Sequence, residues 1–248
     1  MSNELIAARK YYSKVNLILD QVINTQAESI SRAADAVVKT VDQGGSVYLF
    51  GTGHSHLLAE EGHYRAGGLV PVIPILISGL MLHESAINSS KLERMPGLAA
   101  AILSHYQTAA NDVMFIFSNS GVNAVPVEMA LEAKKIGMQV VGVLALSYAK
   151  VAPLSPIGKR LNEIVDIVVD NQIQAGDAVI EIGNTGLFTG PASTIVGAFI
   201  LNAILTEAIC RMDVAGKKPP IYISSNMPGA AEHNQKYLAQ AKTRNPHL

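Results

Sequence analysis

Two short segments place hydroxyl and amide side chains beside glycine directly after apolar runs. Gly51–Ser55 follows the run Val47–Phe50, and Ser118–Gly121 follows the run Val113–Phe117. A turn between a strand and a helix directs unpaired backbone N–H groups at one point, and serine hydroxyls add further donors. The two segments therefore predict an anion site, for which phosphate is the best-suited ligand. The predicted binding residues are Gly53, His54, Ser55, Ser118, Asn119, Ser120, Gly121 and Asn123.

The apolar runs alternate along the chain with patterns of helical period. Repeated strand–turn–helix order predicts a parallel sheet covered by helices on both faces, with ligands at the carboxyl ends of its strands. The predicted fold class is α/β, a doubly wound and mainly five-stranded parallel sheet flanked by helices. Strands are expected at about Val47–Phe50, Val72–Ile77, Val113–Phe117, Val140–Ala145 and Ile164–Val169, and helices at about Ser55–Ala66, Leu98–Tyr106, Pro126–Ile136 and Ile195–Met212.

Both ends of the chain lie outside this alternation. Residues from Asn3 to Val41 form a long amphipathic helical pattern, which is interrupted near Asn24 and ends at Gly44. In the polar C-terminal tail, Ile221–Ser224 has the composition of a strand. We therefore expect an N-terminal helical segment (1–45), a ligand-binding domain (46–216) and a C-terminal tail (217–248) that completes the site or an interface.

Composition limits the class of protein. The chain has 248 residues, 49% of them hydrophobic, and a formal net charge of −1, which is typical of a soluble domain. Lysine and arginine form no cluster, so a nucleic-acid partner is not expected. Pro, Gly or charges break the apolar runs well short of about 20 residues, so we expect no membrane span and a cytoplasmic protein. The one cysteine, Cys210, lies in the apolar run Ala198–Arg211 and is predicted to be a buried, inert thiol.

The two turns, in this order, resemble the pair that defines the sugar isomerase (SIS) domain. Gly51–Ser55 looks like its Gly-x-Gly-x-Ser turn, and Ser118–Gly121 looks like its Ser-x-Ser-Gly turn. The resemblance covers most of Ala7 to Arg211. It implies a sheet of five parallel strands, phosphosugar binding, and a homodimer or homotetramer.

Within this family the chain is most similar to an uncharacterised group of SIS-domain proteins. It is more distantly similar to N-acetylmuramic acid 6-phosphate etherase and phosphoheptose isomerase. Leu187–Thr194 is similar to the Leu-Thr-Gly-Ser-Thr stretch of the etherase. The resemblance implies that the side chains of Ser55, Ser118 and Ser120 bind the phosphate, with help from the backbone of Gly53, Asn119 and Gly121. Asn123 stands where many members have Thr or Ser.

The resemblance does not carry over the catalytic base. Both named relatives have an acid/base Glu ten residues after the serine of the first turn, and here that position is Arg65. Glu61 lies four residues before Arg65 on the expected helix, so it is a candidate base or the partner of Arg65 in a surface or interface ion pair.

Other proton-transfer groups lie in the two polar segments. His83 and Glu84 are in the long connection between Ser78 and Pro96, where they would serve isomerisation or form a polar loop with Glu84 capping a short helix. His233 in the tail could assist opening of a sugar ring, or be a solvated tail residue. The predicted catalytic residues are therefore Glu61, His83, Glu84 and His233.

A metal site is an alternative for the first turn, because the phosphoheptose isomerases that the chain resembles use a His/Glu zinc site. The pattern here lacks the His-Glu-x-x-His spacing that puts two ligands on one helical face, so we predict no metal and no other cofactor, and a turn histidine that hydrogen-bonds the ligand. The residues concerned are His54, His56, Glu60, Glu61 and His63.

Three functions follow from these observations. The first is a sugar-phosphate isomerase that moves a proton between C1 and C2; the second is a phosphosugar etherase or lyase; the third is a sugar-phosphate sensor without catalysis. The long N-terminal helix is expected to pack against a second copy of the chain, because one small sheet cannot cover it.

Overall fold

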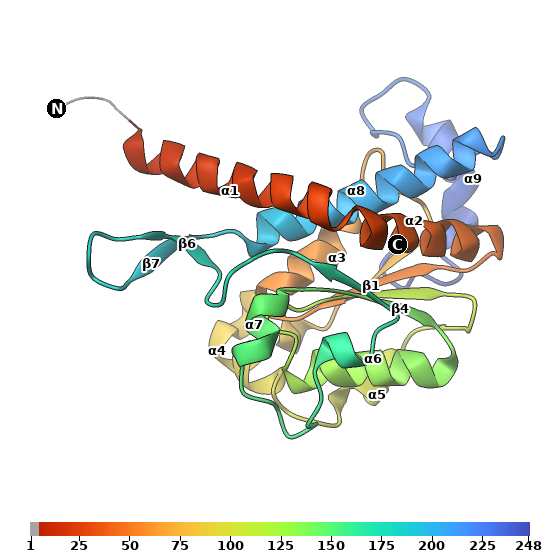
Figure 1. Ribbon diagram of the computed structural model, residues 1–248. Helices are drawn as coiled ribbons and strands as arrows, with labels where there is room; N and C mark the ends of the chain where they lie inside the picture. The colour runs from red at the N-terminus through yellow and green to blue at the C-terminus, as the bar shows by residue number, and fades with distance from the viewer. Residues whose placement is uncertain (1–4) are drawn as a thin grey trace.

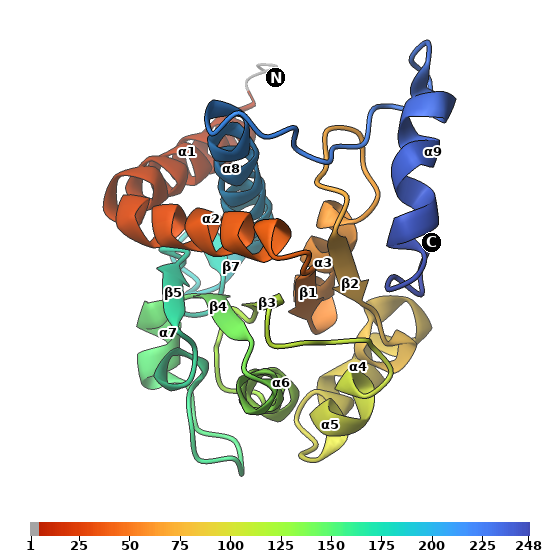
Figure 2. The same cartoon turned by 90° about the vertical axis from the view of Figure 1, so that its right-hand side faces the viewer.

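The computed structural model describes residues 5–248, so the expected helix start at Asn3 lies outside the described residues. Five parallel strands form one sheet in the order β2-β1-β3-β4-β5, with helices on both of its faces (Figures 1 and 2). The predicted α/β fold is confirmed. The strands are β1 (Val47–Gly51), β2 (Val72–Ile75), β3 (Val113–Phe117), β4 (Gln139–Leu144) and β5 (Ile167–Asp170).

Alternate side chains of the strands pack into two separate hydrophobic clusters. Val47 and Leu49 of β1 point into the cluster formed with α1 (Ile6–Thr25), α2 (Ala27–Asp42), α3 (Leu57–Gly62) and α8 (Ser193–Val214). Tyr48 and Phe50 point the other way, toward α5 (Leu98–Leu103) and α6 (Ala124–Ile136). The period of two along a buried strand therefore builds both layers.

The strand order reverses direction at β1. This strand pairs with β2 on one side and with β3 on the other, and the chain continues outward from β3 through β4 to β5. In such sheets the connections after the two central strands part to opposite faces and leave a crevice at the carboxyl ends. The two predicted turns follow β1 and β3, so the topology places both at this crevice.

The N-terminal helical pattern forms two helices. Gln26 separates α1 from α2. The predicted interruption of the helical pattern is therefore confirmed, two residues after its expected position at Asn24. The expected helix over Ser55–Ala66 is shorter in the structure: Gly53–His56 forms a 3-10 turn, and α3 ends at Gly62. The chain then leaves helical geometry, with Tyr64 at φ 42°.

Several elements were not expected from the sequence. The predicted strand at Ile221–Ser224 was wrong beyond its first residue, because only Ile221 forms a β-bridge, to Leu69. Helix α4 (Leu82–Leu92) forms in the connection where a short helix at Glu84 was one of the alternatives. The elements without a sequence-based prediction are α7 (Leu146–Val151), α9 (Ala230–Ala241), the hairpin strands β6 (Ala178–Glu181) and β7 (Phe188–Pro191), and the 3-10 turns Ser78–Leu80 and Leu161–Glu163.

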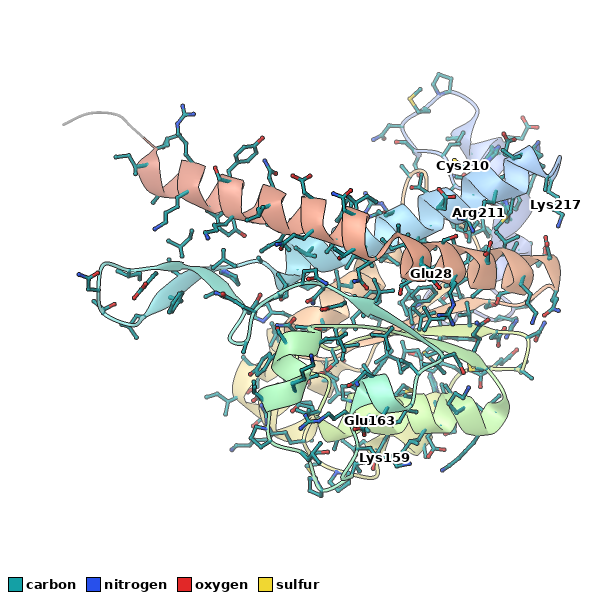
Figure 3. All side chains as sticks on the ribbon, in the orientation of Figure 1. Glu28, Lys159, Glu163, Cys210, Arg211 and Lys217 are labelled. Atoms are coloured by element: carbon teal, nitrogen blue, oxygen red, sulfur yellow. The ribbon has the colours of Figure 1, made fainter. Side chains whose placement is uncertain are left out.

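Helix α8 is the core helix of the first layer. Its length and apolar composition would suffice for a membrane span, yet it packs against α2 and α3 and buries residues such as Ile200 and Ile204. Arg211, which Figure 3 labels near the end of α8, holds the last turns of this helix to α2. Its guanidinium donates to the Ser31 carbonyl oxygen at 3.0 Å. The prediction of a buried thiol was wrong, because Cys210 falls on the outer face of this helix and is exposed.

Candidate functional site

The first turn folds back tightly on the end of β1. The Ser55 N–H donates to the Thr52 carbonyl oxygen at 3.0 Å, which brings the backbone of Ser55 against Gly51. A Cβ atom on Gly51 would lie 2.4 Å from the Ser55 carbonyl oxygen, so no side chain fits there. Gly53 adopts φ 56°, a left-handed conformation that glycine takes without strain. The glycines of this turn are therefore required by its geometry.

The second turn is anchored to the neighbouring strand. The Ala145 N–H donates to the Asn119 carbonyl oxygen at 3.0 Å, and the Asn171 amide donates to the Asn119 side-chain oxygen at 2.9 Å. The Gly121 N–H closes the turn onto the Ser118 carbonyl oxygen at 3.0 Å. In the part of the chain that the structure describes, the N–H groups of Asn119 and Ser120 have no acceptor, so they remain available to a ligand.

Both turns line one cavity of about 300 Å³ at the carboxyl ends of β1 and β3. All of the predicted binding residues border it except Gly121, whose contribution is the closure of the second turn. Asn123 precedes α6 and makes no side-chain cap to that helix, so its amide is free to face the cavity. The lining is dominated by hydroxyl groups: Thr52, Ser55, Ser89, Ser90, Ser118 and Ser120.

A carboxylate and a guanidinium complete the cavity, and sequence reasoning missed both. Glu93, just after α4, accepts a hydrogen bond from the Thr52 hydroxyl at 2.6 Å and pairs with Arg94 Nη1 at 2.8 Å. Its side chain is only 15% exposed, and its backbone oxygen accepts from the Val125 N–H of α6 at 3.0 Å. Arg94 also donates to the Ser90 hydroxyl at 2.8 Å. Glu93 is thus held in a fixed position beside the first turn.

Comparison with known proteins agrees with this architecture. Residues 10–145 match the SIS domain family. The chain belongs to the SIS domain family. It is 44% identical to a UPF0309 protein from Geobacillus thermodenitrificans, with 96% of both chains covered. It is 40% identical to a UPF0309 protein from Brucella anthropi, over 96% of this chain and 98% of the relative.

Solved structures with this fold include two phosphoheptose isomerases. The one from Francisella tularensis has a TM-score of 0.56 at 16% identity and covers 84% of this SIS-domain chain and 98% of its own. The one from Neisseria gonorrhoeae has a TM-score of 0.57 at 13% identity, and the match covers 82% of this chain and 97% of the isomerase. The sugar isomerase domain of an RpiR transcription factor from Sphaerobacter thermophilus has a TM-score of 0.50 at 16% identity, and the match covers 95% of this chain and 98% of that domain. At these identities the likeness concerns the fold.

The four predicted catalytic residues lie outside the cavity of this SIS domain. Glu61 pairs with Arg65 and accepts from the Asn202 amide of α8 at 3.1 Å. His83 and Glu84 are exposed on α4. His233 donates from Nε2 to the Ile221 carbonyl oxygen at 2.8 Å, in α9 beside the far edge of the sheet (Figure 2). A catalytic role for these residues stays a prediction.

The histidines of the first turn are also separated. His54 is exposed and lines the cavity, whereas His56 is buried, with Nδ1 at the Gly53 carbonyl oxygen and Nε2 at 3.4 Å from Glu60. His63 lies away from the cavity, against Asn245 of the tail. Across residues 5–248, no three His, Cys, Asp or Glu side chains converge in a way that could hold a metal ion.

Proposed function

We propose that this protein binds a phosphorylated sugar in the cavity at the carboxyl ends of β1 and β3 and isomerises it by proton transfer between C1 and C2. The observation that carries the proposal is the convergence of two hydroxyl-rich turns and one oriented carboxylate, Glu93, on a single cavity. A volume of about 300 Å³ suits a small polar metabolite.

The phosphate is assigned to the serines of the turns. Hydroxyl groups of Ser55, Ser118 and Ser120, together with the free N–H groups of Asn119 and Ser120, supply donors from two directions. Hydrogen bonds to a charged phosphate oxygen are stronger than those between neutral groups. Arg94 provides the cationic side chain of the lining, which offsets the negative charges of phosphate and Glu93.

Glu93 is assigned as the base. Aldose–ketose conversion requires a group that removes the proton beside a carbonyl and returns it to the neighbouring carbon. The Thr52 hydroxyl and Arg94 each engage one carboxylate oxygen of Glu93, so the carboxylate is oriented before the substrate arrives. This residue would take the role left open by Arg65.

We also infer that the protein is a cytoplasmic homodimer or homotetramer. Helix α1 exposes the large apolar side chains of Ile6, Tyr12 and Leu17, and exposed apolar side chains on a long helix support packing against a second copy. The predicted roles of His83, Glu84 and His233 would require such an assembly, because these residues do not line the cavity of their own chain.

Two alternatives have a specific observation in their favour. For an etherase or lyase, Ser193 at the start of α8 borders a void of about 10 Å³ together with Ser55 and Ser118, so the segment similar to the etherase approaches the turns from behind. For a sensor, the fold is shared with the sugar isomerase domain of an RpiR transcription factor.

One experiment separates the three functions. The purified protein is incubated with hexose, heptose, amino-sugar and muramic acid 6-phosphates, and binding and products are followed by calorimetry and NMR. An isomerase gives an aldose–ketose pair, and a lyase releases the substituent of the sugar. Binding without turnover supports the sensor, and no binding of any phosphosugar contradicts all three.

A further inference from the structure

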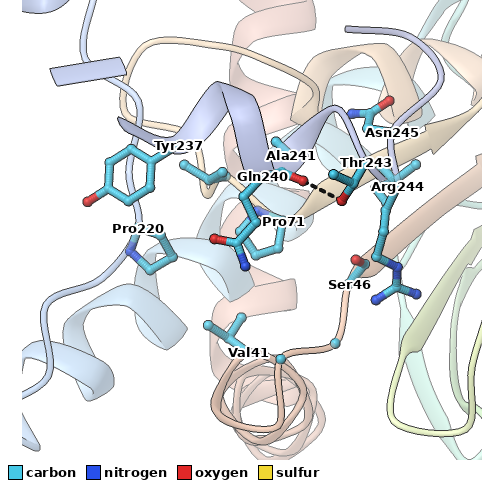
Figure 4. Close-up of a pocket in the computed structure, with 14 residues that line it drawn as sticks. Val41, Ser46, Pro71, Pro220, Tyr237, Gln240, Ala241, Thr243, Arg244 and Asn245 are labelled. Atoms are coloured by element: carbon cyan, nitrogen blue, oxygen red, sulfur yellow. Dashed lines mark hydrogen bonds between the residues drawn. The ribbon is translucent and has the colours of Figure 1, made fainter. Parts of the chain in front are cut away.

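A cavity of about 240 Å³ lies at the amino ends of β1 and β2, at the opposite end of the sheet from the two turns (Figure 4). Segments that are far apart in the sequence form its walls: residues 41–46 before β1, residues 70–73 at the start of β2, and Pro220 with residues 237–245 of the tail. Its lining shares no residue with the lining of the cavity at the turns. It is therefore a separate space in the molecule.

Most of the wall is apolar. Figure 4 shows Pro220 beside Tyr237 on one side of the cavity and Ser46 beside Arg244 on the other. A flat ring packs closely against side chains such as those of Tyr237 and Pro220. The volume is just below the range of about 300–1,000 Å³ that is common for small-molecule sites, so it suits a single ring with a short substituent. The apolar lining residues are Val41, Val70, Pro71, Ile73, Pro220 and Ala241.

One hydroxyl group of the lining has no partner. The Ser46 side chain belongs to a residue that is only 4% exposed, and the backbone N–H of the same residue donates to Asp112 at 2.7 Å. The Ser46 hydroxyl makes no hydrogen bond within residues 5–248 and, unlike that of Ser155, it keeps accessible surface in the cavity. Buried polar groups in folded proteins are nearly always paired. The hydroxyl therefore indicates a hydrogen-bond partner inside the cavity.

The charge of the lining is already balanced. Arg244 is the only charged side chain among the lining residues of the described chain, and its guanidinium donates to the buried Asp112 carboxylate at 2.7 Å. A charged ligand would leave water without finding a counter-ion in this cavity, which is unfavourable. The cavity therefore favours an uncharged ligand.

We propose that this cavity is a second ligand site, which binds a small uncharged ring compound that carries a carbonyl group. The carbonyl oxygen accepts a hydrogen bond from the Ser46 hydroxyl, and the ring packs against Pro71 and Pro220. Because the ligand contacts the end of α2, the start of β2 and the tail at once, its binding stabilises the docked tail. This site goes beyond the proposed function, since it lies apart from the phosphosugar cavity.

The probe for the test is benzamide, and its binding to the wild-type protein is followed by NMR titration. Benzoate serves as the charged counterpart of the same shape. We expect benzamide to perturb the signals of the lining residues, and benzoate to bind at least tenfold more weakly, because its charge has no counter-ion there. The proposal is overturned if benzamide does not bind, if it perturbs only other surfaces, or if benzoate binds as tightly.

The hydrogen bond is tested with Ser46→Ala, which removes only the hydroxyl. This variant should bind benzamide about three- to tenfold more weakly than the wild type does, which is the contribution of one neutral hydrogen bond. Toluene cannot accept that bond, so its affinity should be the same in both proteins. Unchanged benzamide affinity in Ser46→Ala would overturn the assigned ligand class.

A matched pair of variants on α9 locates the site. Ala241→Phe places a ring inside the cavity and should abolish benzamide binding, whereas Ala239→Phe adds the same ring at an exposed position outside the lining and should leave it unchanged. Benzamide binding that survives Ala241→Phe would overturn the site. The phosphosugar should bind equally to both variants, because the two cavities share no lining residue. A selective loss of phosphosugar affinity in Ala241→Phe would contradict the separation of the two sites.

Discussion

The two ends of the sheet are built differently. At the carboxyl ends of β1 and β3, backbone N–H groups and the Asn123 amide lack partners within the described chain, and they border an open, polar cavity. At the amino ends, α9 and the chain after it cover the edge of the sheet, where Arg244 bonds to Asp112 and Asn245 bonds to His63. Unpaired backbone N–H groups thus mark the carboxyl ends, where we propose that the phosphosugar binds, and the Arg244–Asp112 pair marks the amino ends.

The amino end is organised around Asp112. Its side chain is completely buried, and it accepts from the Ser46 N–H at 2.7 Å, the Ala109 N–H at 2.6 Å and the Arg244 guanidinium at 2.7 Å. Figure 4 shows the cavity of about 240 Å³ between this end of the sheet and the tail, with Arg244 and Ser46 on the same side of it. Arg244 is paired with Asp112 and its side chain is 25% exposed, whereas the side chain of Arg94 in the other cavity is paired with Glu93 and is 56% exposed.

The largest expected effect is at the carboxyl end, in Glu93→Gln. The amide keeps the size of the side chain and cannot accept a proton, so turnover of the phosphosugar should fall by about 10²–10⁴-fold. Substrate affinity should change little, because the phosphate is bound by the turns. Steady-state kinetics with calorimetry on the same sample separates the two quantities, and full turnover in Glu93→Gln would remove this residue as the base.

The largest effect on stability is expected at the amino end, in Asp112→Ala. Removing this carboxylate leaves the Arg244 charge without its partner and unpairs the buried Ser46 N–H and the partly buried Ala109 N–H, which should lower the free energy of unfolding by about 3 kcal/mol or more. Urea unfolding measures the change. The matched control is Asp35→Ala, which removes the exposed partner of Arg211 and should cost less than about 1 kcal/mol.

Measuring phosphosugar affinity on Asp112→Ala and Asp35→Ala tests whether the two ends of the sheet act independently. Folded Asp112→Ala should bind the ligand as the wild type does, because Asp112 lies at the opposite end of the strands. A large loss of affinity in the folded variant would show that the two ends are coupled, which contradicts the division of roles.

A smaller effect concerns pH. Burial lowers the pKa of His63, with the His247 charge as the second cause, and burial lowers the pKa of His247, with His105 as the second cause. Neutral His63 accepts from the Asn245 amide at 3.2 Å, and His247 Nε2 lies 3.0 Å from the Tyr106 hydroxyl. The charged pair Arg244–Asp112 lies at the same end of the sheet.

The sign follows from the lowered pKa values. Below about pH 6.5 these histidines bind protons in the unfolded chain more readily than in the folded chain, because folding lowers their pKa values. Their contribution to the free energy of unfolding therefore falls as the pH falls below about 6.5. Unfolding free energies at pH 7.5 and 5.5 should therefore differ more in the wild type than in the His63→Gln/His247→Gln double variant. An identical pH dependence in the two proteins would contradict a role for these histidines.

The smallest effect is expected for Glu61→Gln. Glu61 and Arg65 are both about a third or more exposed, so their pair should contribute less than about 1 kcal/mol to stability. If Glu93 is the base, turnover in Glu61→Gln should stay within a few-fold of the wild type. A loss as large as that of Glu93→Gln would instead restore Glu61 as the catalytic residue predicted from the sequence.

The sequence predicts the parts of this structure that depend on local pattern. The five strands are short runs of apolar residues, and their glycine- and serine-containing turns follow directly, so the fold and the position of the crevice could be predicted. Glu93 could not be placed, because its contact with Thr52 joins residues 41 positions apart. The segment from Ser78 to Pro96 shows only a polar connection in sequence, and α4 within it has a kink at Ser85.

The strand expected at Ile221–Ser224 in the tail was wrong for a related reason. The partners of the tail are scattered over the chain, at Val72, Tyr106 and Asp112, and no periodicity in the tail itself reveals them. The exposure of Cys210 could not be predicted from the sequence either. An apolar helix has few polar residues to mark its outer face, so the exposure of one cysteine depends on how the helix packs.

The central claim is that the two turns hold a phosphate, and calorimetry on a serine double variant tests it most directly. The wild type and Ser118→Ala/Ser120→Ala are titrated with the phosphosugar that binds best and with its unphosphorylated parent. We expect the wild type to bind the phosphorylated compound alone, and the folded double variant to bind it at least 100-fold more weakly, since each lost charge-assisted bond costs about 1.5–3 kcal/mol. Unchanged affinity in the double variant, or equal binding of the unphosphorylated parent, would contradict the account.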